Sequence, residues 1–221
     1  MLKVEDLKLE NLKIFQDDEL YCFTSDSVLL SHFACAKKND DVADFCSGSG
    51  IVGFNFYGLN KNLVKKVTFF ELQKSLYDLS IKSIQANGLE EIFSAYNVKV
   101  QEIDSSFNER FSLILCNPPY MKVTTGDVKE KAEIAMCWSE IALTLKELVK
   151  AVSKCLKFGG RFCMVHRADR LTDAFVLMRE FNIEPKRLQF VNAKGKEPYL
   201  FLIEGVKGGK SGIKVLSPIQ N

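Results

Sequence analysis

Short apolar runs and longer amphipathic stretches alternate along most of the chain. Runs rich in β-branched and aromatic residues predict strands, which we place at 41–46, 66–72, 97–103, 111–116, 160–166, 187–193 and 199–205. Apolar residues at steps of three and four predict helices, which we place at 25–37, 50–58, 73–87, 131–156 and 169–181. Strands that alternate with helices in this way are typical of an α/β fold with a mainly parallel central sheet.

The end of the chain departs from this alternation. Only the short polar link KGKEP separates the last two predicted strands, so we expect them to form an antiparallel hairpin. The predicted fold is therefore a seven-stranded, mostly parallel sheet with an antiparallel C-terminal hairpin and with helices on both faces. With 221 residues and no internal repeat or linker, the chain is expected to form a single domain, with residues 207–221 as a basic, glycine-rich tail.

Composition and charge exclude several classes of protein. With 47% apolar and 26% charged residues the chain is expected to fold, and its net charge of +2 leaves any nucleic-acid binding to local patches. The seven cysteines never form a C-x-x-C pair, so we expect reduced thiols, no metal site and a cytoplasmic location. The charged N-terminus and the lack of an apolar run of roughly 18 residues argue against a signal peptide and a membrane span.

A glycine-rich loop follows the first strong strand. The segment DFCSGSG (44–50) lies between a predicted strand and a predicted helix. Gly48 and Gly50 allow the backbone to turn tightly and to approach a ligand, and the helix N-terminus offers free N–H groups. The next predicted strand ends near Glu71, whose carboxylate can accept hydrogen bonds from ribose hydroxyls. Together these features predict a cofactor that contains a nucleoside.

The stretch SLILCNPPYMK (112–122) ends an apolar strand with a rigid corner. Pro118 and Pro119 lack the backbone N–H that a sheet ladder needs, so the strand must stop there. At the carboxyl edge of the sheet, the side-chain carbonyl of Asn117 and the backbone carbonyl of Pro118 can accept both hydrogens of a planar NH2 group. Tyr120 offers a flat face on which a base can stack. This corner predicts methyl transfer to an amino nitrogen, with alignment and hydrogen bonding in place of a strong base.

The ordered set DFCSGSG, FFEL and LILCNPPY resembles the class I S-adenosylmethionine-dependent methyltransferases that act on exocyclic or amide nitrogens. The segments 12–33, 166–191 and 195–216 look like those of bacterial tRNA1(Val) adenine-N6 methyltransferases, and the similarity covers nearly the whole chain. The resemblance implies a Rossmann-like fold and S-adenosylmethionine as cofactor, with S-adenosylhomocysteine as product. It also implies tRNA as the partner and N6-methylation of the adenine next to the anticodon. The oligomeric state stays open between a monomer and a weak homodimer.

The resemblance assigns roles to residues. Residues 1–40 would close over the cofactor, and 41–206 would form the catalytic core. Glu71 would hold the ribose hydroxyls, and Asp104 would approach the amino group of the cofactor adenine. The implied catalytic set is Asn117, Pro118, Pro119 and Tyr120. The implied cofactor-binding set is Ser25, Asp26, Asp44, Cys46, Ser47, Gly48, Gly50, Glu71, Asp104 and Asn117.

The sequence departs from the family at a few positions. Cys46 stands where the family usually has the first glycine of its loop. Cys137 and Trp138 stand where relatives have polar residues, near the expected substrate side. These departures bear on the identity of the substrate.

Basic side chains gather in the last third of the chain. They are expected to grip RNA phosphates if the hairpin and the tail fold towards the catalytic edge. A target adenine must also be unstacked, which costs a few kcal/mol, and such a surface would help to offset that cost. The expected RNA-binding set is Tyr120, Arg167, Lys186, Arg187, Lys194, Lys196, Lys207 and Lys210, with Lys214 as a further basic residue.

Three alternative functions stay open. A protein-glutamine N5-methyltransferase of the release-factor type would use the same corner, because an amide NH2 fits it equally well. Such enzymes usually carry a helical substrate domain before the glycine loop, whereas only 43 residues precede Asp44 here. A guanine-N2 rRNA methyltransferase is the second alternative. The third is a catalytically silent RNA-binding protein, against which the intact Asn117–Tyr120 corner argues.

Overall fold

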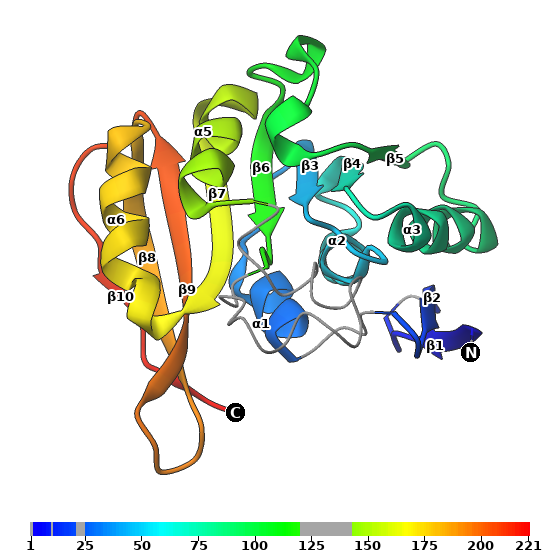
Figure 1. Ribbon diagram of the computed structural model, residues 1–221, viewed down its shortest axis with the longest axis horizontal. Coiled ribbons are helices and arrows are strands. Elements are labelled where there is room, and N and C mark those ends of the chain that lie inside the picture. Colours follow the sequence, from blue (N-terminus) through cyan, green and yellow to red (C-terminus); the bar gives the residue numbers. More distant parts are fainter. Residues whose placement is uncertain (1, 10, 21–24, 120–142) are drawn as a thin grey trace, which may run out of the picture.

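The computed structural model describes residues 2–9, 11–20, 25–119 and 143–221. A nine-stranded sheet has the order β10-β8-β9-β7-β6-β3-β4-β5, with β11 paired to β8 (Figure 1). From β5 to β7 the neighbouring strands are parallel, whereas β9 is antiparallel to β7 and β8. The predicted α/β fold with an antiparallel C-terminal hairpin is confirmed. The long strands are β3 (Asp40–Phe45), β4 (Val64–Glu71), β5 (Phe93–Asn97), β6 (Phe111–Cys116), β7 (Leu156–Arg167), β8 (Ile183–Asn192) and β9 (Pro198–Lys207).

Helices cover both faces of the sheet, as predicted. In β6, Leu113 and Leu115 are buried on the face that carries α1 and α2, while Ile114 and Cys116 are buried on the face of α5 and α6. Successive side chains of a strand point to opposite faces, so a strand that is covered on both sides needs an unbroken apolar run. No helix in the described ranges is long and apolar enough to cross a membrane. The helices are α1 (Ser25–Phe33), α2 (Ile51–Asn60), α3 (Lys74–Ala86), α5 (Leu145–Cys155) and α6 (Leu171–Glu180).

One strand lies earlier in the chain than the sequence predicts. The strand predicted at 97–103 is wrong, because β5 ends at Asn97 and Val100–Glu102 form a short 3-10 helix, η1. Val100 and Ile103 are buried three residues apart, which suits a helical turn rather than a strand. The real strand, FSAYN, lies at the edge of the sheet and is mostly exposed, so it carries only a weak apolar signal.

A single helix over 131–156 is also contradicted. Thr144 Oγ1 accepts a hydrogen bond from the backbone N–H of Glu147 (3.3 Å), and a Glu147 side-chain oxygen accepts one from the backbone N–H of Thr144 (2.8 Å). This reciprocal capping box marks the start of a helix, so α5 begins at Leu145. Residues 131–142 lie outside the described ranges.

The first residues of the chain form a separate antiparallel hairpin that the sequence did not predict. It consists of β1 (Leu2–Asp6) and β2 (Lys13–Asp17). The backbone N–H of Phe15 donates to Ser83 Oγ (2.9 Å), which ties β2 to α3. This part of the N-terminal segment therefore packs on a helix beside the sheet.

The last residues of the chain join the sheet. The short strands β10 (Lys214–Val215) and β11 (Ile219–Gln220) both pair in parallel with β8. The Asn221 side-chain amide donates to Tyr199 Oη (2.8 Å) and to Ser25 Oγ (3.1 Å). The basic tail therefore covers the edge of the hairpin formed by β8 and β9.

Candidate active site

The carboxyl ends of β3, β4 and β6 meet at one edge of the sheet. Phe45, the last residue of β3, lies opposite Phe70 on β4 and opposite Cys116 on β6. From these positions the chain continues into the glycine loop, into Glu71 and into the Asn117 corner. Figure 1 shows the tip of β6 pointing towards α1. Open parallel sheets bind their ligands at this edge.

The glycine loop has an unusual backbone. The φ angles of Cys46, Gly48 and Gly50 are positive, at 57°, 58° and 93°. A Cβ at Gly50 would lie 2.8 Å from the Phe69 ring, whereas a Cβ at Gly48 would meet no atom within 4 Å. Gly48 therefore faces open space where a ligand can approach the backbone. Cys46 takes the left-handed conformation with a side chain, at a cost of roughly 1–2 kcal/mol.

Asp44 is fully buried near the end of β3. Its Oδ2 accepts a hydrogen bond from the backbone N–H of Gly53 in α2 (2.9 Å). The pKa of Asp44 is raised to about 8, mainly by burial; the Gly53 hydrogen bond opposes this rise and the nearby Glu71 carboxylate adds to it. Its Oδ1 has no hydrogen-bond partner in the described part of the chain. Asp44 thus offers a buried acceptor to a donor from outside the protein.

Glu71 holds the glycine loop against the end of β4. One carboxylate oxygen accepts a hydrogen bond from the backbone N–H of Gly48 (2.8 Å), and the other accepts one from the backbone N–H of Gln73 (2.8 Å). Burial raises the pKa of Glu71, and these hydrogen bonds oppose the rise. The backbone N–H of Leu72 also donates to this carboxylate, which leaves one of its four lone pairs to accept from a hydroxyl group.

Asn117 follows β6 directly and is held by a helix from the start of the chain. Its Nδ2 donates to Ser27 Oγ on α1 (3.0 Å). Its Oδ1 is buried without a hydrogen-bond partner among the described residues. Pro118 is buried and Pro119 is half-buried. The corner therefore presents Asn117 Oδ1 as an acceptor for a ligand. The sequence analysis did not identify Ser27 as the residue that supports Asn117.

Three buried oxygens at this edge lack partners within the described ranges: Asp44 Oδ1, Ser47 Oγ and Asn117 Oδ1. Buried polar atoms are nearly always paired in proteins, and leaving one unpaired costs about 1–3 kcal/mol. Two acceptors and a hydroxyl at neighbouring strand ends fit a ligand with several N–H and O–H groups. S-adenosylmethionine, which the sequence motifs imply, is such a ligand, so the residues present fit it.

Asp104 follows the last residue of β5, Asn97, by seven positions in the chain. It is exposed and caps the 3-10 helix η2 (Ser105–Phe107), where Oδ1 accepts from the backbone N–H of Ser106 (2.8 Å). Hydrogen bonds from Ser106 lower the pKa of Asp104. Asn97 instead ends β5 opposite Glu71, and its amide donates to the backbone oxygens of Glu71 (2.9 Å) and Leu72 (2.8 Å). Asn97 is therefore the polar residue that the end of β5 brings beside Glu71.

The remaining predicted site residues divide between α1 and the undescribed segment. Ser25 begins α1 and donates to an Asp26 carboxylate oxygen (3.3 Å), and Asp26 is buried. The bond from Asn117 to Ser27 places this first turn of α1 beside the corner. Tyr120, together with Cys137 and Trp138, lies outside the described residues.

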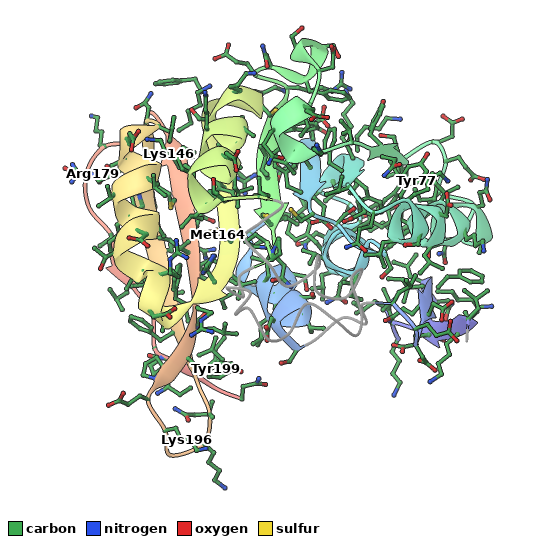
Figure 2. All side chains as sticks on the ribbon, viewed as in Figure 1. Tyr77, Lys146, Met164, Arg179, Lys196 and Tyr199 are labelled. Carbon is green, nitrogen blue, oxygen red and sulfur yellow. The ribbon has the colours of Figure 1, made fainter. Side chains whose placement is uncertain are left out.

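The predicted RNA-binding residues lie at opposite ends of the sheet. Lys194 and Lys196 are in the turn between β8 and β9, beyond the end of β7 at Arg167. Figure 2 shows Lys196 at the tip of this hairpin, with Tyr199 above it. Both lysines are exposed and form no ion pair with described residues. Arg167 pairs with Asp169 through two hydrogen bonds (3.2 and 3.0 Å).

The other four basic residues face away from the strand ends or serve the fold. Arg187 packs over the Phe33 ring, and its guanidinium pairs with Glu204 (3.1 Å). Lys207 lies at the opposite end of β9, where it donates to the backbone oxygens of Ser153 (2.7 Å) and Leu156 (2.9 Å). The remaining two are linked to each other at that end, because Lys186 Nζ donates to the backbone oxygen of Lys210 (3.0 Å).

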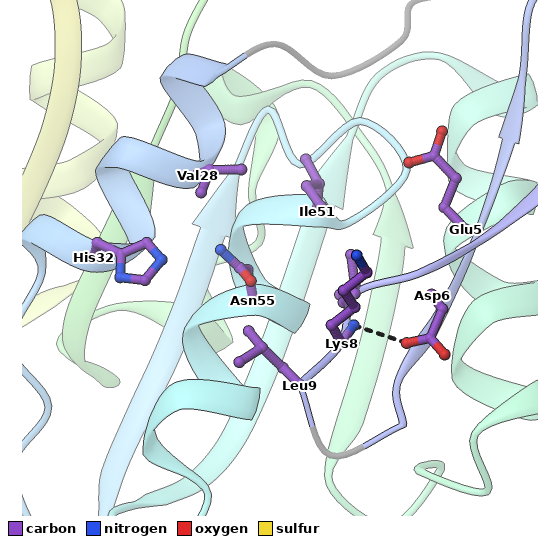
Figure 3. Close-up of a pocket in the computed structure, with 9 residues that line it drawn as sticks. Glu5, Asp6, Lys8, Leu9, Val28, His32, Ile51 and Asn55 are labelled. Carbon is purple, nitrogen blue, oxygen red and sulfur yellow. Dashed lines mark hydrogen bonds between the residues drawn. The ribbon is translucent and has the colours of Figure 1, made fainter. Parts of the chain in front are cut away.

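A pocket with a volume of about 350 Å³ lies beside the glycine loop. Figure 3 shows Val28 and His32 of α1 and Ile51 and Asn55 of α2 on its walls. None of the site residues predicted from the sequence lines it. Its opposite wall consists of Glu5, Asp6, Leu7, Lys8 and Leu9.

The raised pKa of Asp44 predicts a pH-dependent stability of the ligand-free protein. An unfolded aspartate loses its proton near pH 4, whereas the folded one keeps it up to about pH 8. The folded state is therefore destabilised relative to the unfolded state as the pH rises through this window. Asp44→Asn removes this loss. The free energy of unfolding of the variant minus that of wild type should therefore increase from pH 5 to pH 8, by on the order of 3 kcal/mol.

Urea unfolding of both proteins at pH 5 and pH 8 measures this change. The comparison isolates Asp44 because Glu71 and the other carboxyl groups are the same in both proteins. A stability difference between Asp44→Asn and wild type that is equal at the two pH values contradicts the raised pKa.

Comparisons with known proteins agree with this geometry. A family model described as Methyltransferase small domain matches residues 14–184. A search of curated proteins finds no match. The fold matches a predicted O-methyltransferase from Agrobacterium tumefaciens with a TM-score of 0.68 and 13% identity, covering 88% of this chain and 86% of that one.

Two further solved structures share the fold. The tRNA m1G37 methyltransferase of M. jannaschii matches with a TM-score of 0.64 and 15% identity, covering 95% of this chain and 55% of that one. TYW2 of P. horikoshii in complex with MeSAdo matches with a TM-score of 0.66 and 15% identity, covering 94% of this chain and 72% of that one. At these identities the likeness establishes the fold, and the family model establishes the kind of enzyme.

Proposed function

The chain belongs to the methyltransferase small domain family of class I S-adenosylmethionine-dependent enzymes, and on that premise we propose that it methylates the N6 atom of an adenine in tRNA. The proposed target is the adenine next to the anticodon of tRNA1(Val). The outer segments 12–33, 166–191 and 195–216 support this choice through their resemblance to enzymes with that substrate.

The observation that carries the proposal is the buried Oδ1 of Asn117, which has no hydrogen-bond partner among the described residues. An adenine amino group is planar and has two hydrogens that need acceptors. Asn117 Oδ1 accepts one, and the backbone carbonyl of Pro118 is proposed to accept the other. Accepting these hydrogens draws the nitrogen lone pair out of conjugation and makes the nitrogen a better nucleophile. The corner needs no deprotonated side chain for this step.

The loop and strand ends are proposed to hold the methyl donor. S-adenosylmethionine supplies an electrophilic methyl group on a sulfonium. Asp44 and Ser47 offer oxygens that have no partner within the described part of the chain, and Gly48 offers open backbone. Glu71 offers the remaining lone pair of its carboxylate to the ribose hydroxyls. These residues fix the cofactor beside the corner that orients the adenine.

Methyl transfer to defined acceptors tests the proposal. The purified protein is incubated with radiolabelled S-adenosylmethionine and, separately, with unmethylated total tRNA, rRNA and release factor. The proposal expects label in tRNA only, recovered as N6-methyladenosine after nucleoside analysis. Label in glutamine or in N2-methylguanosine overturns the substrate assignment in favour of a protein or rRNA acceptor.

The placement of the lysines makes a prediction about RNA binding. Lys194 and Lys196 lie in the turn between β8 and β9, beyond the end of β7, whereas Lys210 and Lys214 are exposed elsewhere on the hairpin edge. Replacing the first two with Ala should raise the Kd for tRNA about tenfold and lower its salt slope by roughly two, because each lysine contacts about one phosphate.

The double variant Lys210→Ala/Lys214→Ala is the matched control, since it removes the same charge. Filter binding or fluorescence anisotropy over a range of salt concentrations measures both variants. Equal losses of affinity in the two double variants contradict a binding surface at the hairpin tip and indicate a general charge effect.

A further inference from the structure

The inner face of α1 carries two buried serines one helical turn apart. Ser27 Oγ accepts a hydrogen bond from Asn117 Nδ2 (3.0 Å), and Ser31 Oγ accepts one from Asn55 Nδ2 on α2 (2.6 Å). Both serines are at most 2% exposed. Residues four apart lie on the same face of a helix, so α1 uses one face to reach both the corner and the glycine-loop helix.

In this structure Asn117 uses the donor end of its amide to bind Ser27. An asparagine side chain has a donor end and an acceptor end, and it can present either one by turning about its last torsion. With Nδ2 bound to Ser27, Oδ1 is the end that has no partner among the described residues. With the amide turned over, NH2 would meet the amino group of the substrate, and neither group could accept a hydrogen from the other.

We propose that Ser27 is a positioning residue for methyl transfer, which acts by holding Asn117 with its carbonyl oxygen towards the substrate amino group. This inference rests on the proposed function, because it assigns Asn117 Oδ1 to the amino group. Ser27 does not touch the reacting atoms itself. Its effect should therefore fall on the rate of the bound complex and leave the binding of S-adenosylmethionine nearly unchanged.

Helix α1 is the element that supports Asn117 through Ser27. The helix begins at Ser25, so Ser27 lies in its first turn, and Leu30 and Phe33 are buried further along its inner face. These apolar contacts fix the helix against the core. A rigid element thus supports Asn117, which is what a precisely oriented hydrogen bond requires.

Three variants separate positioning from packing. Ser27→Ala should lower kcat for tRNA methylation about 10-fold to 100-fold, with KM for tRNA and Kd for S-adenosylmethionine within about threefold of wild type. Ser27→Thr keeps the hydroxyl and should recover most of the loss. Ser31→Ala is the matched control, because it removes the same group from the same face and should leave kcat within about twofold. Equal losses of kcat in Ser27→Ala and Ser31→Ala overturn the proposal.

A second measurement needs no substrate. In protein labelled with ¹⁵N-asparagine, the Asn117 side-chain NH2 signal is identified by its loss in Asn117→Ala. Its hydrogen exchange should be slow in wild type and Ser31→Ala and at least tenfold faster in Ser27→Ala. If the hydrogen-exchange rate of the Asn117 NH2 group is unchanged in Ser27→Ala, the claim that Ser27 positions Asn117 is overturned. A wild-type protein that fails to methylate tRNA overturns the proposed function instead, so the two failures are distinguishable.

Discussion

Replacing Asn117 with Ala is expected to lower kcat about 10²-fold to 10³-fold, while the affinity for S-adenosylmethionine stays within several-fold. The side-chain carbonyl of Asn117 is buried at the edge where the strand ends meet, and no residue in the described ranges forms a hydrogen bond with it. Its proposed hydrogen bond to the substrate amino group strengthens as the nitrogen becomes a nucleophile, so its loss affects the transition state more than the bound state. The proposed cofactor contacts of Asp44 and Glu71 are unaffected by the change, because these residues lie on other strands.

Single-turnover methyl transfer and calorimetric titration with S-adenosylmethionine measure the two quantities separately. Asn60→Ala is a control of the same chemistry, because Asn60 ends α2 and its amide donates to the backbone oxygen of Phe56 within the same helix (2.8 Å). The control should turn over at nearly the wild-type rate. An Asn117→Ala protein that loses cofactor binding and keeps its turnover contradicts the role assigned to the corner.

The second large effect is expected on stability, at a buried ion pair between β3 and β7. Arg161 Nη2 lies 2.6 and 2.7 Å from the two carboxylate oxygens of Asp40, and the side chains are 5% and 3% exposed. Ser112 Oγ donates to Asp40 Oδ1 (2.7 Å), so the network also includes β6. Replacing Asp40 with Ala leaves the Arg161 charge buried without its partner. We expect a loss of about 3–5 kcal/mol in the free energy of unfolding.

Urea unfolding measures this loss against an exposed ion pair. Asp78 pairs with Lys74 on the surface of α3, with side-chain exposures of 46% and 67%. Exposed pairs of this kind contribute about 0–1 kcal/mol, so Asp78→Ala should barely change the free energy of unfolding. A similar small change in Asp40→Ala would show that the buried pair does not hold β3 against β7.

The alternation of apolar runs and amphipathic stretches predicted the fold well. The strands β3, β4, β6 and β7 are buried on both faces, and each run of apolar residues therefore appears clearly in the sequence. The glycine loop and the Asn117 corner were also predictable, because glycine and proline limit the backbone locally. Those constraints act within a few residues and need no knowledge of distant contacts.

The strand before Asp104 was predicted in the wrong place. Val98, Val100 and Ile103 suggested a strand over 97–103, whereas β5 ends six residues earlier, at Asn97 rather than Ile103. The role of Asp104 beside the cofactor adenine, which the family resemblance implies, stays a prediction. An edge strand with exposed side chains has a weak pattern, so its boundary cannot be read with certainty from apolar spacing.

Charge alone also does not locate a residue along a strand. Lys196 and Lys207 are similar in the sequence, yet one lies at the hairpin tip and the other at the opposite end of β9. Ser27 left a faint signal, since it and Ser31 are polar residues on the buried face of α1. Polar residues on a buried helix face indicate that they form hydrogen bonds, but they do not indicate which residues are the partners.

A crystal structure of the protein with S-adenosylhomocysteine and adenosine tests the central claim most directly. The account predicts that the adenine N6 atom lies about 3 Å from both Asn117 Oδ1 and the backbone oxygen of Pro118. It also predicts that this nitrogen faces the sulfur of the bound cofactor product. A corner that faces away from that sulfur, or an Asn117 Oδ1 that is paired with the protein's own side chains, would contradict it.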